Sequence, residues 1–292
     1  MVEYVAQSIT HAAVAILVVE ALLRVWRIDA PDVRVGFRLL PLFFPLVALP
    51  AFLVLAKVRG TEIFQDRWAL FSGGRWGGAG AAALALAAAL GTGLFLRDLV
   101  RFLSREREGR RPPVTPAAGD LRDLRAEVGR LARSLGVEPP RLAVPDTSSP
   151  ILLVAGVRRP ALVVSTGTLA RLDGRERRAA LTHELAHVAR RDPLLGWVLM
   201  GCSVAAFFNP VVHVAVRLVL RELEWRADDL AVAAGADAPA LAAALSTLAT
   251  DGTSHSRRRR LLRPRAPGTI PFPWLGVAMT GVALGLLLFF VV

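Results

Sequence analysis

The 292-residue sequence contains one cysteine, Cys202, and one lysine, Lys57. A single cysteine excludes an internal disulfide and a zinc site built from cysteines. Charged residues make up only 21% of the chain and apolar residues 54%, which excludes a disordered chain. Basic residues outnumber acidic ones by 12, and all the basic residues except Lys57 are arginine. The positions of these arginines decide whether nucleic acid or a membrane surface is the expected partner.

Four apolar stretches approach or reach the roughly 20 residues that a helix needs to cross a bilayer. They lie at residues 9–26, 37–58, 77–96 and 272–292. The first lacks the basic start and the small-residue cleavage site of a signal peptide, so we expect it to be retained. The second contains three prolines, which membrane helices tolerate. The third carries Gly80, Ala83, Ala87 and Gly91 at close-packing spacing, for which simple alanine bias is an equally good explanation.

Arginines flank the long segment between the third and the fourth apolar stretch. Six lie between residues 97 and 111, and six more lie between residues 257 and 265. The cytoplasmic flanks of membrane helices carry such an excess. We therefore expect residues 97–271 to be cytoplasmic and both termini to be outside. The arginine run 257–260 is expected to lie against anionic lipid headgroups, and nucleic-acid binding is the less favoured interpretation.

These features predict a mostly α-helical, multi-pass membrane protein with four membrane helices and a cytoplasmic α+β domain between the third and the fourth. The expected parts are three membrane helices in 1–103, a linker at 104–119, the cytoplasmic domain at 120–256, a basic juxtamembrane segment at 257–271 and the last membrane helix at 272–292. Within the domain, periodicity predicts helices at 120–135, 168–172, 175–191 and 214–234. Short β-like runs are expected at 141–144, 151–157 and 161–165, the last two as a hairpin.

An uncharged run at residues 194–208 interrupts the cytoplasmic domain. Pro210 separates it from a second apolar stretch that ends at Leu220. Because the run is short for a membrane span, we expect a buried or membrane-hugging helical hairpin rather than two more crossings.

The string HELAH at residues 183–187 lies within the helix expected at 175–191. His183 and His187 are four residues apart and share a helix face, so both imidazoles can reach one metal ion. Glu184 lies beside them and can act as a general base on a water molecule. With this composition, chance produces such a string in only about 0.3% of chains, which favours a metal site.

Two histidines leave a catalytic zinc site one protein ligand short. The helix expected at 214–234 offers several acidic residues as the third ligand. We expect Glu224 to be this ligand, with Glu222 as the alternative. Asp228 lies four residues after Glu224, and we expect its carboxylate to fix the tautomer of a zinc-ligating histidine.

Two further residues are candidates for contact with the oxyanion or the substrate. His213 follows Asn209-Pro210 in an apolar helix, and histidines can donate to the oxyanion that forms in peptide hydrolysis. A packed histidine fits better, because nothing in its spacing directs it to the metal. Arg226, next but one to Glu224, is the second candidate.

Three motifs resemble the zinc-peptidase core of the BlaR/MecR family of bacterial integral-membrane metallopeptidases. They are HELAHVARRDP (183–193), FFNPVVH (207–213) and RELEWRADD (221–229), and the hairpin at 151–172 resembles the segment before the family's histidine motif. The resemblance covers residues 120–234 by motif. It implies a zinc ion held by His183, His187 and Glu224, with Glu184 as general base and Asp228 in support. It also implies a protein substrate, either a cytosolic transcriptional repressor or the enzyme itself.

The sensor-type members of the BlaR/MecR family continue past their last membrane helix into an extracellular penicillin-binding domain. This sequence ends at Val292, so we do not expect β-lactam sensing. The HtpX-type membrane peptidases of protein quality control are a second resemblance, because they share HExxH and the later ExxxD. Their usual distribution of membrane helices fits this sequence less well.

The expected function is that of a membrane-bound zinc endopeptidase that cleaves proteins at the cytoplasmic face of the membrane, in signalling. The strand at 151–157 is a candidate edge for holding substrate by β-addition, although an internal hairpin explains the same pattern. The alternatives are HtpX-like quality control, a non-enzymatic signalling scaffold, and a transporter using Glu20. The scaffold should have lost a ligand, and the transporter should show more ionisable residues in its spans. A homodimer is compatible with the sequence, and no direct nucleic-acid partner is expected.

Overall fold

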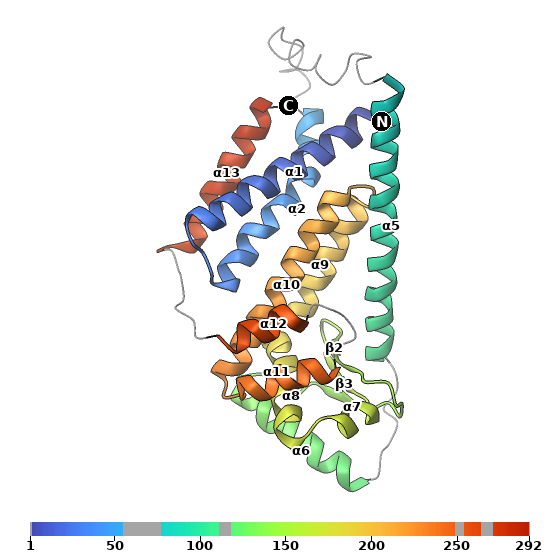
Figure 1. Ribbon diagram of the computed structural model, residues 1–292, viewed down its shortest axis with the longest axis vertical. Coiled ribbons are helices and arrows are strands. Elements are labelled where there is room, and N and C mark those ends of the chain that lie inside the picture. Colours follow the sequence, from blue (N-terminus) through green and yellow to red (C-terminus); the bar gives the residue numbers. More distant parts are fainter. Residues whose placement is uncertain (1, 55–76, 111–117, 249–253, 264–270, 292) are drawn as a thin grey trace. The chain divides into compact units, whose positions relative to one another are not determined.

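The computed structural model describes residues 2–54, 77–110, 118–248, 254–263 and 271–291 (Figure 1). The chain divides into two compact units. Unit 1 comprises residues 1–99, 198–222 and 267–292, and unit 2 comprises residues 100–197 and 223–266. The two units therefore do not follow the contiguous domain expected at 120–256, because residues 198–222 of the apolar hairpin belong to unit 1.

Helices make up unit 1. It contains α1 (Val2–Val25), α2 (Pro31–Val54), α13 (Pro273–Val291) and parts of α5 (Gly77–Arg110), α9 (Asp192–Ala205) and α10 (Pro210–Ala233). Unit 2 contains the remainder of these last three helices and a small sheet with five further helices among its described residues. These are α6 (Ala118–Ser134), β1 (Arg141–Ala143), β2 (Leu152–Ala155), β3 (Ala161–Val164), α7 (Thr166–Arg171), α8 (Gly174–Ala189), α11 (Ala238–Leu248) and α12 (Ser254–Leu261).

Helices occupy the described parts of all four apolar stretches. Within the described residues, α1 and α5 are long and apolar enough to cross a membrane, over Ser8–Val25 and Gly80–Gly109. α13 qualifies only as a shorter apolar helix over Pro273–Leu286, and residues 55–58 of the second expected stretch lie outside the described part. Two of the four expected membrane helices thus meet the criterion of length and composition, and the four-span arrangement stays a prediction.

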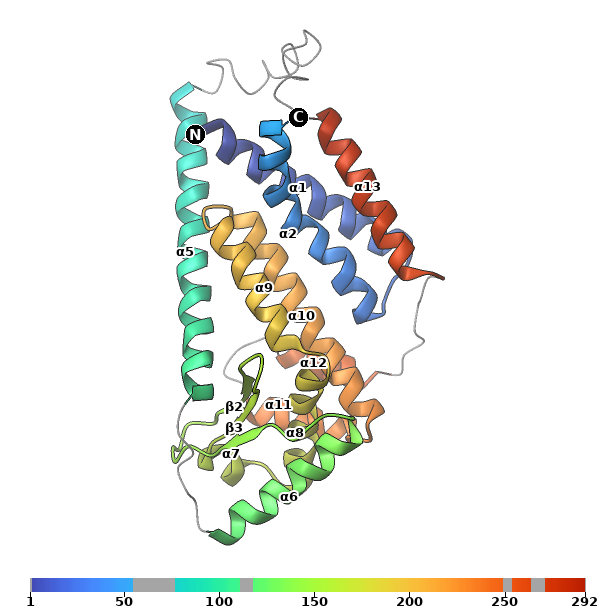
Figure 2. The same cartoon turned by 180° about the vertical axis from the view of Figure 1, so that it is seen from behind.

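Helices α1, α2 and α13 pack together in unit 1 (Figures 1 and 2). α2 begins at Pro31 and remains helical through Pro41, Pro45 and Pro50. A Cβ atom at Gly36 of α2 would lie 3.2 Å from a methyl group of Val277, so the glycine permits a close approach of α2 and α13. The shared core consists of Ala15, Val19, Leu23, Ile28, Phe37 and Leu284.

The expected helical hairpin is formed by α9 and α10. Asn209, which is fully buried, directly precedes α10 and caps it: its Oδ1 accepts a hydrogen bond from the backbone N–H of Val211 at 3.0 Å. Its Nδ2 donates to the backbone carbonyl of Ser8 in α1 at 2.9 Å. α5 also approaches this turn closely, because a Cβ atom at Gly91 would lie 2.2 Å from the carbonyl oxygen of Phe208. Of the small residues noted in α5, Gly91 is buried in this contact.

The sheet of unit 2 has the strand order β1-β3-β2. β1 pairs with β3 in parallel, and β2 pairs with β3 as the expected antiparallel hairpin. Gly156 supplies the left-handed conformation that the hairpin turn requires, with a φ of 89°. α6 and α8 pack with the strands around a core of Leu124, Val128, Ala132, Leu142, Val144, Leu162, Val164, Leu181 and Leu185.

Two elements differ from the expectations. α5 continues through Arg110, so residues 104–110 of the expected linker are helical. Arginine and glutamate are good helix formers, which explains this extension. The arginine run 257–260, expected as part of a basic juxtamembrane segment at lipid headgroups, forms part of the helix α12 in unit 2, and two of its arginines pair with acidic residues of α10.

Candidate metal centre

The two histidines of the HExxH string lie on one face of α8, within unit 2. The helix begins at a capping box, in which Asp173 accepts hydrogen bonds from the first turn and Glu176 accepts one from the Asp173 N–H. Leu181 and Leu185 place the opposite face of α8 in the core. The Nε2 atoms of His183 and His187 consequently point toward each other and lie 3.2 Å apart.

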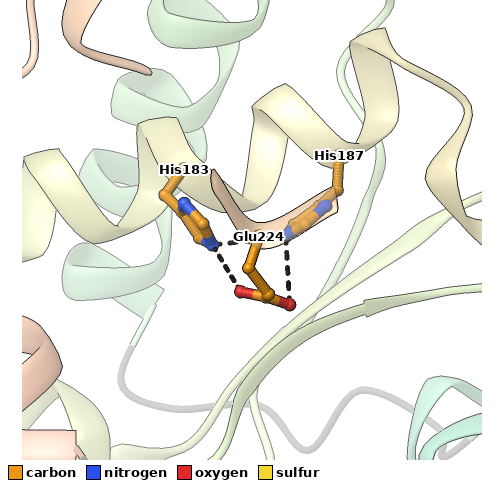
Figure 3. Close-up of side chains that lie close together, drawn as sticks. All are labelled: His183, His187 and Glu224. Carbon is orange, nitrogen blue, oxygen red and sulfur yellow. Dashed lines mark hydrogen bonds and ion pairs between the residues drawn. The ribbon is translucent and has the colours of Figure 1, made fainter. Parts of the chain in front are cut away.

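Glu224 of α10 completes a group of three ligands (Figure 3). Its Oε2 lies 3.4 Å from His183 Nε2, and its Oε1 lies 3.8 Å from His187 Nε2. Ligands at zinc–ligand bond lengths in a tetrahedron are about 3.4 Å apart, so these donor atoms fit one zinc ion. Two imidazoles and one carboxylate are also the donor set of catalytic zinc sites, in which a fourth position stays open.

A carboxylate supports each imidazole from behind. His183 Nδ1 donates to Asp228 Oδ1 at 3.0 Å, and His187 Nδ1 donates to Asp192 Oδ2 at 2.7 Å. Both aspartates are buried, and Arg226 donates to the other oxygen of Asp192. These contacts fix the tautomer in which each Nε2 lone pair is directed toward the metal position.

The turn between α8 and α9 carries Asp192 to its place behind His187. Arg191 adopts a left-handed conformation there, with a φ of 55°. This conformation is uncommon for a residue other than glycine, and such outliers cluster at functional sites. The turn lets α9 begin at Asp192, only five residues after the histidine that this carboxylate contacts.

Arg257 of α12 brings a positive charge into contact with the ligands. Its Nη1 lies 2.7 Å from Glu224 Oε2, and its Nη2 donates to Asp228 Oδ1 at 2.6 Å. The same Nη2 lies 3.1 Å from His183 Nε2. The Arg257 side chain is 13% exposed, so its guanidinium faces two carboxylates and an imidazole in largely buried surroundings.

The electrostatics of the site follow from these contacts. Burial and the charge of Arg257 lower the pKa of His183, but its hydrogen bonds with Asp228 and Glu224 outweigh both and raise the pKa to about 9. Burial raises the pKa of Glu224, but the charges of Arg257 and the histidines hold it well below its usual range. Glu224 is therefore ionised at neutral pH, which is the form that binds a cation.

The other predicted site residues lie in different surroundings. Glu184 is half-buried on α8 between the two histidines, and its charge helps to raise the pKa of Arg257. Glu222, the alternative ligand, is fully buried in unit 1, where it accepts hydrogen bonds from Arg34 at 2.9 Å and from Arg38. His213 is likewise buried in unit 1, and its Nε2 lies 3.0 Å from the Phe207 carbonyl oxygen. Of the two glutamates, the structure brings Glu224 to the histidines.

Two residues of the site were missed in the sequence. Asp192 is part of the string RRDP that follows the histidines, and its position just after the predicted end of the helix was a usable signal. Arg257 gave no such signal, because it is one of four consecutive arginines and nothing in the sequence distinguishes it from the other three.

The site lies within a segment of the chain that matches a known protein family. Residues 140–238, which include His183, Glu184, His187, Glu224 and Asp228, match the family described as BlaR1 peptidase M56. A protease HtpX homolog from Acidiphilium cryptum is 37% identical over 97 residues, covering 30% of this chain and 33% of the relative. A protease HtpX homolog from Pelotomaculum thermopropionicum is 31% identical over 158 residues, covering 53% of this chain and 51% of the relative. The protease HtpX of Xanthomonas oryzae pv. oryzae is 34% identical over 123 residues, covering 41% and 40%.

Both resemblances expected from the motifs are therefore confirmed for the peptidase segment. The chain spans between a third and about half of the length of these curated relatives. No solved structure matches the chain.

Proposed function

We propose that this protein is a membrane-bound zinc endopeptidase that cleaves protein substrates at the cytoplasmic face of the membrane. The observation that carries the proposal is the convergence of His183, His187 and Glu224, whose ligand atoms all lie within 4.8 Å of one another. The carboxylates behind both histidines and the match of residues 140–238 to a peptidase family support it. The α1 and α5 helices support the association with a membrane.

The chemistry divides between the metal and Glu184. When bound, zinc supplies a Lewis acid that lowers the pKa of a coordinated water to about 7. Glu184 accepts a proton from the attacking water and passes it to the leaving nitrogen of the peptide. Asp192 and Asp228 keep the two imidazoles in the tautomer and orientation that bind the metal.

The sheet of unit 2 offers a place for an extended substrate. β2 lies at one edge of the order β1-β3-β2, and its residues Leu152–Val154 are half-buried. An edge strand has backbone N–H and C=O groups available for pairing with an extended peptide. We therefore assign β2 as the strand that aligns the substrate backbone.

Two biological settings fit such an enzyme. The match to the BlaR1 peptidase family supports a role in signalling, with a cytosolic transcriptional repressor or the enzyme itself as substrate. The similarity to HtpX proteases supports a role in quality control instead. Cleavage of one defined cytosolic protein in cells would favour signalling, and cleavage of many misfolded membrane proteins would favour quality control.

Metal content of the detergent-purified protein tests the site directly. We expect about one zinc per chain in the wild type, and loss of zinc in both His187→Ala and Glu224→Ala. No zinc in the wild type under metal-replete conditions would contradict the proposal. Zinc that is lost only with His187 would move the third ligand to another acidic residue.

A second prediction separates the general base from the ligands. Glu184→Gln should retain zinc and lose cleavage of fluorescein-labelled casein by about 100-fold or more, because the amide cannot accept the proton. Zinc content and cleavage are measured on the same preparation. Wild-type turnover by the zinc-loaded variant would remove the general-base role from Glu184.

A further inference from the structure

The helix α12 presents its four arginines to different surroundings. Arg257 reaches Asp228 and Glu224, and Arg260 donates to Asp229 of the same helix α10 at 2.7 Å. Arg258 and Arg259 are exposed. Residues three apart on a helix share a face, so one face of α12 holds two charge-assisted contacts to α10 and the other faces solvent.

Arg257 uses the atoms that a metal ion would use. Its Nη1 lies 2.7 Å from Glu224 Oε2, which is also the carboxylate oxygen nearest to His183. Its Nη2 lies 3.1 Å from His183 Nε2. The same Nη2 lies 3.4 Å from His183 Nδ1, so the positive charge of Arg257 lies directly beside the imidazole that would bind the metal.

The remaining contacts of Arg257 do not conflict with a metal. Its Nε donates to Asp228 Oδ2 at 3.0 Å, and its Nη2 donates to Asp228 Oδ1 at 2.6 Å. This two-point contact with a fully buried carboxylate leaves Nη1 as the arm that reaches Glu224. Because the guanidinium is planar and its Nη2 contacts both Asp228 and His183, it must shift against Asp228 to release Glu224 and His183.

We propose that Arg257 is a competing cation that sets the metal affinity of this site, because its guanidinium holds Glu224 and His183 and gives them up when the metal binds. The inference rests on the proposed zinc site. When the metal ion takes the ligands, Arg257 stays next to Asp228. The metal ion and the guanidinium then repel each other, because both are positively charged and lie close together. Arg257 thus makes the metal bind more weakly and exchange more readily than the same ligands would alone.

The competing role and a supporting role predict opposite results. If Arg257 only positioned Asp228, its loss would loosen His183 and weaken metal binding. If Arg257 competes, its loss removes a positive charge from the ligands and tightens metal binding. The direction of the change in zinc affinity therefore decides between the two roles without any measurement of protease activity.

The experiment measures zinc affinity of the metal-free, full-length protein in detergent by competition with a chelator of known affinity. Arg257→Gln should bind zinc at least about tenfold more tightly than the wild type. Arg258→Gln, which removes an exposed arginine one residue away, should stay within about twofold of the wild type, as for a screened surface charge.

Unchanged or weaker zinc binding by Arg257→Gln would overturn the inference. If this variant does not fold without metal, Arg257→Met replaces it, because methionine is a long, flexible side chain without a charge. Tighter zinc binding by Arg257→Met is then expected, and unchanged or weaker binding overturns the inference. A wild type that binds no zinc contradicts the proposed function itself, so the two failures are distinguishable.

Discussion

Asp192 and Asp228 hold the two imidazoles from different parts of the chain. Asp228 contacts His183 from α10, and Asp192 contacts His187 from the first turn of α9. Asp192 also receives a hydrogen bond from Arg226, the residue that we had considered for contact with substrate. In this arrangement Arg226 acts on His187 through Asp192, as part of the support of the metal ligand.

The contact between Asp192 and His187 can be tested by one substitution. Asp192→Asn should weaken zinc binding by about 10- to 100-fold, because an amide orients the imidazole less firmly and makes its Nε2 a weaker ligand than a carboxylate does. The measurement is chelator competition on the purified protein. Asp123→Asn, at an exposed position of α6, is the control and should leave zinc affinity unchanged. Equal affinities of Asp192→Asn and the wild type would show that His187 needs no partner behind it.

The residues of the site differ in how far the sequence could predict them. His183, Glu184 and His187 could be predicted, because they belong to one short motif and helical spacing alone places them together. Glu224 was preferred to Glu222 from the sequence, but burial of Glu222 with Arg34 and Arg38 depends on contacts between distant segments. Arg257 could not be predicted, because the sequence does not show which of the four consecutive arginines reaches the metal ligands.

At the scale of elements, the turn between α9 and α10 depends on a glycine of α5. Gly91→Ala should destabilise the protein by about 1–3 kcal/mol, because the new methyl group would overlap the Phe208 carbonyl and force the backbones apart. Thermal unfolding in detergent measures the effect as a lower Tm.

Gly93→Ala, two residues further along the same helix, is the matched control. A Cβ atom there meets nothing within 4 Å, so the substitution should leave Tm unchanged or raise it through the better helix propensity of alanine. If both variants unfold at the wild-type temperature, the close contact between α5 and the turn is not required for stability.

Most elements were predictable, and the exceptions have a common cause. The hairpin of β2 and β3, α6, α8 and α10 follow apolar periodicity and turn residues, which are local signals. The arginine run was expected at lipid headgroups, since an apolar stretch follows it. The structure instead places Arg257 and Arg260 against acidic residues of α10. The sequence around the arginine run does not indicate that a distant helix carries the acidic residues that pair with it.

At the scale of the whole molecule, the orientation in the membrane remains the main prediction. Cys202 is the only cysteine and is buried, so Cys202→Ala gives a background without thiols. In this background, Glu138→Cys, at an exposed position of unit 2, should be protected in intact cells from a membrane-impermeant maleimide. A cysteine added after Val292 should react, because the arginine-rich segments are expected on the cytoplasmic side.

Permeabilised cells provide the control for this labelling experiment. Both cysteines should then react, which shows that each thiol is accessible to the reagent. Labelling of Glu138→Cys in intact cells would place unit 2 outside and contradict a cytoplasmic protease.

The metal ligands come from both sides of the apolar hairpin in the sequence. His187 and Glu224 lie on either side of residues 198–222, the part of the hairpin that belongs to unit 1. A metal ion bound by both would close this stretch into a loop, as a cross-link does, and loop closure removes conformational freedom from the open chain. Occupancy of the site would then restrict where the apolar hairpin leaves unit 2 and where it returns. Binding of one ion would thus act as a cross-link on a chain segment whose turn contacts α1 and α5 in unit 1.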